Sequence, residues 1–341
     1  MEAAVTVERS PRQTRWSGRG VHADELADEL ARLHHGLGSD GRAQALARTL
    51  NLIVAPCSDR SERVVDRALE ELGAHTPSRT LVLRRHEAAR LDAELWIECE
   101  VPEAAGLVGI CHDRVLLAAD DSRLAHASSL VAPLLVGDLP TVVWLPDGEA
   151  SVPDPSLLGR ADHLLTDSRS GGEGRLRRLS ELAREVPVHD LAWGRLAFWR
   201  AATAAAFDPP ERRSLLPRVD RLELCHGEDA SSAALLLAGW IAARAAWRPA
   251  PIERENGRGR ARITRPDGAV VTVELASDRS ATGCGGIEGL TFGAGAAEVA
   301  IERCGATSRL RDVFAEALRP EASFARGYPE AVAAAAGMLG A

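Results

Sequence analysis

The chain has 341 residues, a formal net charge of -8 and a hydrophobic fraction of 45%. This length favours two domains, because a single hydrophobic core stops growing at about 250–300 residues. No apolar run approaches the ~20 residues that span a bilayer, and the acidic balance argues against a nucleic-acid partner. We therefore expect a cytoplasmic protein that binds neither membrane nor nucleic acid.

The N-terminal stretch over residues 1–21 is polar and carries four arginines, Arg9, Arg12, Arg15 and Arg19. It lacks the apolar segment of a signal peptide. We interpret it as a disordered tail. A basic arm for nucleic acid is the alternative, and the acidic charge of the whole chain disfavours it.

All 41 basic residues are arginine, so the sequence contains no lysine. A P-loop needs a lysine on the phosphates, and a protein kinase needs its strand lysine. Aldolase-type and pyridoxal enzymes need a lysine that forms a Schiff base. The absence of lysine excludes these classes of enzyme, whatever its cause.

The six cysteines, at positions 57, 99, 111, 225, 284 and 304, include no C-x-x-C pair. This spacing fits neither a disulfide framework nor a zinc ribbon. The ten histidines are likewise scattered without the spacing of a metal site. We expect reduced structural thiols and no metal or cofactor.

The first half of the chain alternates helices with short apolar strands. A strand over 49–55, a helix from Asp59 or Ser61 and a strand over 79–84 are typical of a parallel βαβ unit. Further strands are expected over 93–99, 107–118, 141–145, 163–167 and 186–189, with helices over 23–37, from 121, over 175–184 and over 191–207. We predict an α/β domain over residues 22–210 with a mixed, partly parallel sheet.

The pattern changes after Pro209 and Pro210, where we place the domain boundary. The second half is expected to contain strands over 218–225, 251–265, 269–276 and 289–303, an apolar helix over 231–247 and two alanine-rich C-terminal helices. We predict an α+β domain over residues 211–341 with an antiparallel sheet.

No residue pattern names a catalytic nucleophile or base. The glycine-rich run 283–289 lacks the spacing of a dinucleotide fingerprint and is interpreted as a turn. The run 170–174 precedes a helix, where an anion could bind, and a flexible loop is the alternative. Trp144 ends a strand, whereas Trp193 and Trp199 lie on the helix that Asp190 caps; such tryptophans belong either to a core or to a protein interface.

These segments resemble the glucose-6-phosphate dehydrogenase assembly proteins (OpcA). The matching runs are Leu134–Pro146, Leu165–Ser168, Asp190–Arg200 and Ser231–Trp240, in family order, with Pro209 and Pro210 after the third. The most specific is Trp-x-Arg-Leu-x-x-Trp-Arg at residues 193–200. One departure is Leu145, where the family often has a second aromatic residue.

The resemblance implies a non-catalytic protein that binds glucose-6-phosphate dehydrogenase, promotes its active oligomer and activates it at the entry to the oxidative pentose phosphate pathway. The residues that we expect to contact this partner are Trp144, Trp193, Arg195, Trp199 and Arg200. A sugar-phosphate-binding α/β enzyme and a scaffold for another dehydrogenase stay open as alternatives. Thioredoxin control, linked to some members of the family, cannot be carried over, because no cysteine here lies in a redox motif.

Arg200 has an unusual place on its predicted helix. Residues of an α-helix are spaced about 100° apart, which puts Arg200 in the apolar sector of Trp193, Leu196 and Thr203, and Phe198 on the other side. A guanidinium in such a sector needs a partner. The partner is either an internal carboxylate, Asp162 or Asp167, or a group on the dehydrogenase.

Overall fold

The computed structural model describes residues 5–10, 13–38, 48–72, 76–100, 110–148, 152–255, 257–278, 284–302, 309–319 and 323–340. It contains two compact units, Met1–Leu165 and Thr166–Ala341. The division differs from the expected boundary at residue 210. The reason is local: Pro210 is the first residue of a short helix, α8 (Pro210–Arg213), which suits proline's fixed φ angle, and this helix lies within the second unit.

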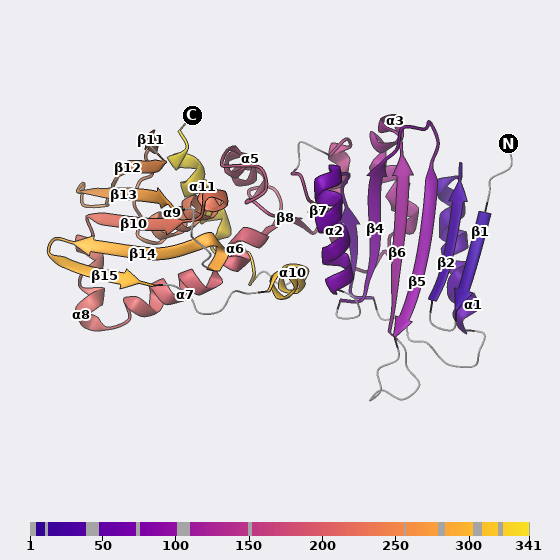
Figure 1. Cartoon of the computed structure of the whole chain (residues 1–341), viewed down its shortest axis with the longest axis horizontal. Helices are drawn as coiled ribbons and strands as arrows, with labels where there is room; N and C mark the ends of the chain where they lie inside the picture. Colours follow the sequence, from indigo (N-terminus) through magenta and orange to yellow (C-terminus); the bar gives the residue numbers. More distant parts are fainter. Residues whose placement is uncertain are drawn as a thin grey trace. The chain divides into compact units, whose positions relative to one another are not determined.

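The first unit is built on a mixed sheet with its strands in the order β1-β2-β5-β6-β4-β3-β7-β8 (Figure 1). Strands β3 (Leu50–Val54), β4 (Ser78–Arg85), β6 (Ile110–Ala119) and β7 (Thr141–Leu145) pair in parallel, whereas β5 (Asp92–Glu100) is antiparallel to β6. The strand β8 (His163–Thr166) ends at the boundary between the units. The α/β class and the partly parallel sheet predicted for this half are confirmed.

Two strands occupy much of the stretch that was expected to be a disordered tail. These are β1 (Val5–Ser10) and β2 (Gln13–Arg19), which pair with each other, and β2 also pairs with β5. Thr14 and Trp16 on β2 are buried, while Gln13 and Arg15 are exposed. This alternation is the pattern of a strand with one face in the core, so hydrophobic burial overrides the polar composition.

Helices lie on both faces of this sheet. In α1 (Ala23–Gly38), His34 contacts Asp113, whereas in α2 (Asp59–Leu72), Asp66 pairs with Arg84. Asp113 lies beside Arg79 on the paired strand β4. Arg79 and Arg84 point to opposite faces of β4, because side chains alternate along a strand. α1, which contacts Asp113, and α2, which contacts Arg84, therefore cover opposite faces of the sheet. The remaining helical segments of this unit are α3 (Asp121–Leu124), α4 (Ala127–Val131), η2 (Ala132–Leu134) and η4 (Pro155–Arg160).

Asp113 holds the first unit together electrostatically. Its carboxylate is fully buried and lies 2.7 Å from a nitrogen of Arg48, 2.8 Å from one of Arg79 and 2.9 Å from Nε2 of His34. Burial opposes ionisation, but the contact with His34 and the charges of Arg79 and Arg48 hold the pKa of Asp113 below its usual range. The four residues come from separate segments, so local sequence patterns did not indicate the cluster.

The second unit contains a mixed sheet in the order β11-β12-β13-β10-β14-β15. Its strands are β10 (Arg221–His226), β11 (Glu253–Glu255), β12 (Arg258–Thr264), β13 (Val270–Ser277), β14 (Ile287–Ala294) and β15 (Ala297–Ile301). The predicted antiparallel sheet is corrected in one place, because β10 pairs in parallel with β13. Between β10 and β13 the chain passes through helix α9 (Ser231–Arg244) and then through β11 and β12. It therefore enters β13 in the same direction as β10.

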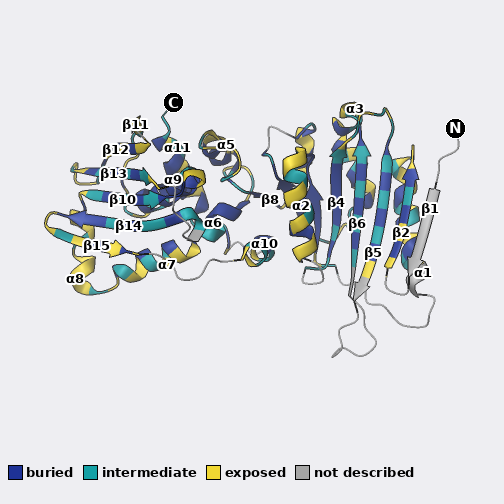
Figure 2. Ribbon diagram, viewed as in Figure 1, coloured by how far each residue is buried: buried dark blue, intermediate teal, exposed yellow. Residues whose placement is uncertain are grey.

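Helices α9 and α11 (Tyr328–Met338) form much of the core of this unit, as the burial colours in Figure 2 show. They approach closely at Gly239, where an added Cβ would lie 2.4 Å from the Ala331 carbonyl oxygen. The other helical segments are α5 (Gly174–Leu182), α6 (Leu191–Arg195), α7 (Ala197–Ala206), η5 (Leu216–Arg218), η6 (Glu228–Ala230), η7 (Cys284–Gly286) and α10 (Leu310–Ala317), and β9 (Val188–Asp190) precedes α6.

Candidate functional site

The segment with the most specific sequence pattern folds as two helices, not one. α6 ends at Arg195 and α7 begins at Ala197, with Leu196 between them at φ -82° and ψ 0°. Gly194 lies at the end of α6, where an added Cβ would approach Val313 to 2.5 Å and Phe324 to 2.9 Å. The close approach of these two side chains therefore requires glycine at this position.

Trp193 and Trp199 form part of the core of the second unit. Trp193 is 1% exposed, and its Nε1 donates a hydrogen bond of 3.0 Å to the Phe324 carbonyl. Its ring meets the edge of Tyr328, with centroids 5.8 Å apart. Trp199 is 0% exposed. Neither ring reaches the surface of this unit, so any effect on a partner would be transmitted through the helices that they hold.

Trp144 lies in the first unit, on the buried strand β7. Its side chain is 3% exposed, and its carbonyl accepts a hydrogen bond of 2.9 Å from Ala55. Its ring thus belongs to the core of the sheet. The partner contact expected for Trp144 stays a prediction, and it would require this core to open.

Arg200 turns its side chain back over α6. Its guanidinium carbon lies 3.6 Å from the centroid of the Trp193 ring, and Nη1 donates to the Trp193 carbonyl. Burial lowers the pKa of Arg200 to about 10, against the attraction of Glu316. The apolar sector predicted for Arg200 is confirmed, but the internal partner is a ring and a carbonyl in place of Asp162 or Asp167.

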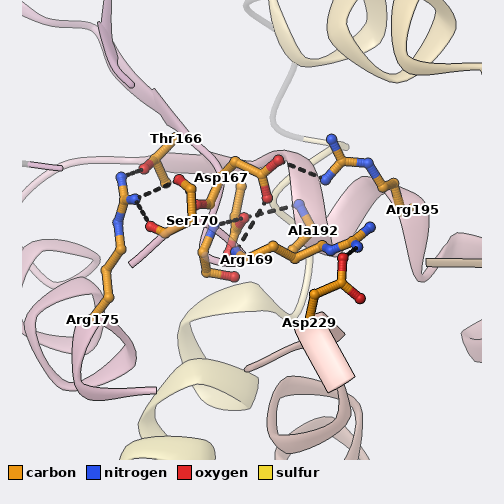
Figure 3. Close-up of polar contacts among 10 residues, drawn as sticks. Thr166, Asp167, Arg169, Ser170, Arg175, Ala192, Arg195 and Asp229 are labelled. Carbon is orange, nitrogen blue, oxygen red and sulfur yellow. Dashed lines mark hydrogen bonds and ion pairs between the residues drawn. The ribbon is translucent and has the colours of Figure 1, made fainter. Parts of the chain in front are cut away.

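Arg195 is anchored to the loop that follows β8. Its Nη1 lies 2.8 Å from Oδ2 of Asp167 (Figure 3). The Arg195 side chain is largely buried. Arg169 on the same loop pairs with Asp229 at 2.5 Å. These two ion pairs fix the loop to α6 and to η6.

Arg175 fills the glycine-rich loop that was considered as an anion site. Its Nη1 donates to the Ser170 carbonyl at 2.7 Å and to the Ser170 hydroxyl at 2.9 Å, and its Nη2 donates to the Thr166 hydroxyl (Figure 3). Gly171 and Gly172 have positive φ angles, which glycine adopts readily. The guanidinium thus binds the loop's own oxygens, which disfavours an anion site here.

Asp190 organises the same region from within the core. Its Oδ1 accepts hydrogen bonds from the backbone of Ser168 at 3.0 Å and of Ala192 at 2.9 Å, which confirms the predicted cap of α6. The Tyr328 hydroxyl donates to its other oxygen at 3.1 Å. Burial, reinforced by the charge of Asp167, raises the pKa of Asp190 above its usual range.

The outer side of α7 is exposed and apolar. Phe198 is 38% exposed, in agreement with its expected place opposite Trp193. The other exposed residues of α7 are alanines, Ala197, Ala201, Ala204 and Ala205. Helical spacing predicted the place of Phe198, but this exposed surface was not expected, because the tryptophans and arginines of the helix were the candidate contact residues.

Within the described ranges, no group of three or more histidine, cysteine, aspartate or glutamate side chains could hold a metal ion. No helix in that part of the chain is long and apolar enough to cross a membrane. The region around α6 and α7 is instead a network of buried aromatic rings, ion pairs and capped helix ends. Its chemistry is that of a rigid scaffold with an exposed helix face.

The fold and this region define a two-domain protein with an α/β unit followed by an α+β unit. Two family models match it: residues 69–184 match the N-terminal domain of the glucose-6-phosphate dehydrogenase subunit, and residues 186–326 match the C-terminal domain. The chain belongs to this OpcA family.

Curated relatives support the same family assignment. The provisionally named OxPP cycle protein OpcA of Synechococcus elongatus is 33% identical over 198 residues, covering 54% of this chain and 44% of the relative. That of Nostoc punctiforme is 29% identical over 215 residues, covering 60% of this chain and 44% of the relative. The matched region thus spans less than half the length of these relatives.

Solved structures show only a distant likeness. A WlbA dehydrogenase from Thermus thermophilus covers 84% of this chain and 94% of its own at 15% identity and a TM-score of 0.43. A scyllo-inositol dehydrogenase from Lactobacillus casei covers 86% and 96% at 9% identity and a TM-score of 0.41. Scores this low carry no argument about the chemistry of this chain.

Proposed function

We propose that this chain is a non-catalytic partner of glucose-6-phosphate dehydrogenase, which it binds, helps to assemble and activates allosterically in the cytoplasm. The observation that carries the proposal is the match of both domains to the family of dehydrogenase subunits, over residues 69–184 and 186–326. The second match includes α6, α7 and the Asp190 cap.

The chemistry of the candidate site supports a binding role. The ionisable side chains around α6 are engaged with one another: Arg195 with Asp167, Arg169 with Asp229, and Asp190 with Tyr328. Such pairs rigidify a scaffold, and a rigid surface loses little conformational entropy when it binds a protein. Trp193, Trp199 and Arg200 then act as the support of α7.

Sedimentation velocity tests the assembly role directly. The dehydrogenase from the same organism is measured alone and with increasing amounts of this chain. We expect the chain to co-sediment with the dehydrogenase and to shift it to a larger oligomer. Separate sedimentation of the two proteins at micromolar concentration would contradict the proposal.

A further inference from the structure

A cavity of about 460 Å³ opens on the α2 side of the first unit's sheet. Cavities of this size commonly bind small molecules. It lies where β4 and β6 begin and β5 ends (Figure 1), and the C-terminal part of α2 forms one of its walls. All the residues that line it belong to the first unit, so the cavity is formed without the residues around α6 and α7.

Residues on one face of the sheet form the floor of this cavity. Arg114 on β6 lies between Trp96 on β5 and Thr80 on β4 in the register of the paired strands. Glu98 follows Trp96 by two residues, and side chains two residues apart on a strand point to the same side. The floor therefore combines an aromatic ring, a guanidinium, a hydroxyl and a carboxylate.

Arg114 is a charge that the fold leaves unpaired. It lines the cavity and is half-buried, and burial lowers its pKa, against the attraction of Asp66, Glu70 and Glu98. Among the described residues, none forms a hydrogen bond or an ion pair with its guanidinium. Arg79 on the neighbouring strand, by contrast, is bound to a buried carboxylate. A partly desolvated guanidinium needs a partner, and a bound anion would supply one.

Two carboxylates line the same cavity without closing on Arg114. Glu70 on α2 and Glu98 on β5 are both exposed, and both attract Arg114 through space. A ligand held by Arg114 therefore also meets these two negative charges. They would repel a phosphate dianion, whereas they would attract a ligand that carries a positive charge beside its anionic group.

The remaining walls favour an apolar body. Leu69 and Leu72, both buried, line the cavity from α2. Trp96 lines it from the sheet, and the guanidinium carbon of Arg15 lies 4.9 Å from the centroid of its ring. An indole held in this way offers a large apolar surface that loses little conformational entropy when a ligand binds.

We propose that this cavity binds a small zwitterion, an α-amino acid with a large apolar side chain. Arg114 binds the carboxylate with two parallel hydrogen bonds. Glu70 and Glu98 accept hydrogen bonds from the ammonium group, and the side chain packs against Trp96 and the two leucines of α2. The inference goes beyond the proposed function, since this binding requires no dehydrogenase.

Isothermal titration calorimetry of the full chain with L-phenylalanine tests the proposal. We expect one molecule to bind per chain. Two analogues that each lack one charge, N-acetyl-L-phenylalanine and L-phenylalaninamide, should bind at least about tenfold more weakly. Absence of binding by L-phenylalanine, or tighter binding of glucose 6-phosphate, would overturn the proposal.

A variant of the guanidinium tests the carboxylate site. Arg114→Gln should raise the Kd for L-phenylalanine at least about tenfold, because it removes the charge that binds the carboxylate. The matched control is Arg63→Gln, at an exposed position on α2, which should leave the Kd at the wild-type value. The same Kd for both variants would contradict the role of Arg114.

The exposed carboxylates give a test that does not depend on the folding of the Arg114 variant. Replacing Glu70 and Glu98 by glutamine should weaken the binding of L-phenylalanine but not that of N-acetyl-L-phenylalanine. The preference for the free ammonium group should therefore fall roughly tenfold. A purely structural effect would weaken both ligands equally, and an unchanged or equally weakened pair of Kd values would overturn the ammonium site.

Discussion

Arg200 and Trp193, seven residues apart, form a stacked pair that joins α6 to α7. The guanidinium carbon lies 3.6 Å from the ring centroid, and the same side chain donates to the Trp193 carbonyl. The charge is thus satisfied within the unit. Arg200, which the sequence offered as a contact residue, thus supports the junction of α6 and α7.

Replacing Arg200 by alanine should lower both stability and dehydrogenase stimulation. A partly desolvated cation–π contact is worth up to about 2 kcal/mol, and one hydrogen bond adds about 1 kcal/mol. We expect the free energy of unfolding in urea to fall by about 1–3 kcal/mol. Arg63→Ala on α2 is the exposed control. A variant with normal unfolding and normal stimulation would show that the pair supports neither.

Asp190 is expected to tolerate asparagine but not alanine. Alanine removes the α6 cap and leaves the Tyr328 hydroxyl and the Ser168 amide without their acceptor, at a cost of about 2–4 kcal/mol. Asparagine keeps an oxygen in place and should change stability by less than about 1 kcal/mol. Urea unfolding of both variants at neutral pH checks this prediction, and equal destabilisation would contradict it.

The raised pKa of Asp190 predicts how its contribution to the free energy of unfolding depends on pH. Folded Asp190 keeps its proton at pH values where the unfolded chain has lost it, since its pKa lies above the ordinary value of 3.8. Its contribution to stability is therefore full below pH 3.8 and is lost as pH rises through the folded pKa. Asparagine does not titrate, so the stability of Asp190→Asn relative to the wild type should rise with pH. A difference that is flat or falls with pH would contradict the assignment.

Local sequence patterns predicted many elements of this fold and some of its details. The short apolar run 49–55 and the spacing of the following helix predicted the β3-α2-β4 unit, which pairs in parallel. Asp190 was identified as a cap from its place before an apolar helix. The angular position of Arg200 also followed, because helical geometry depends only on sequence spacing.

Contacts between distant segments were not predictable in this way. Tyr328 reaches Asp190 from 138 residues away, and the parallel pairing of β10 with β13 depends on the path of the whole chain. β2 was missed although Thr14 and Trp16 alternate with polar residues, because the arginines of the stretch dominated its interpretation. For the candidate site, the sequence left Trp193 and Trp199 open between a core and a protein interface, and the structure places both rings in the core.

The two described free thiols should be unreactive, and oxidation should leave activation unchanged. Burial, with Asp147 and Glu62 nearby, raises the pKa of Cys57 to about 12, and burial also raises that of Cys225. Thiolates are the reactive form, so labelling by iodoacetamide at neutral pH should be slow at both. The structure does not describe the side chains of the other four cysteines. Reversible loss of activation, mapped by mass spectrometry to a cysteine pair, would contradict the prediction.

The most direct test of the account is the rate of NADPH formation by the cognate dehydrogenase as this chain is titrated into the assay. The chain alone should produce no NADPH from glucose 6-phosphate and NADP. Added to the dehydrogenase, it should raise kcat or lower KM by an amount that corresponds to about 1–3 kcal/mol of coupling. An unchanged rate at saturating chain, with the dehydrogenase from the same organism, would contradict the central claim.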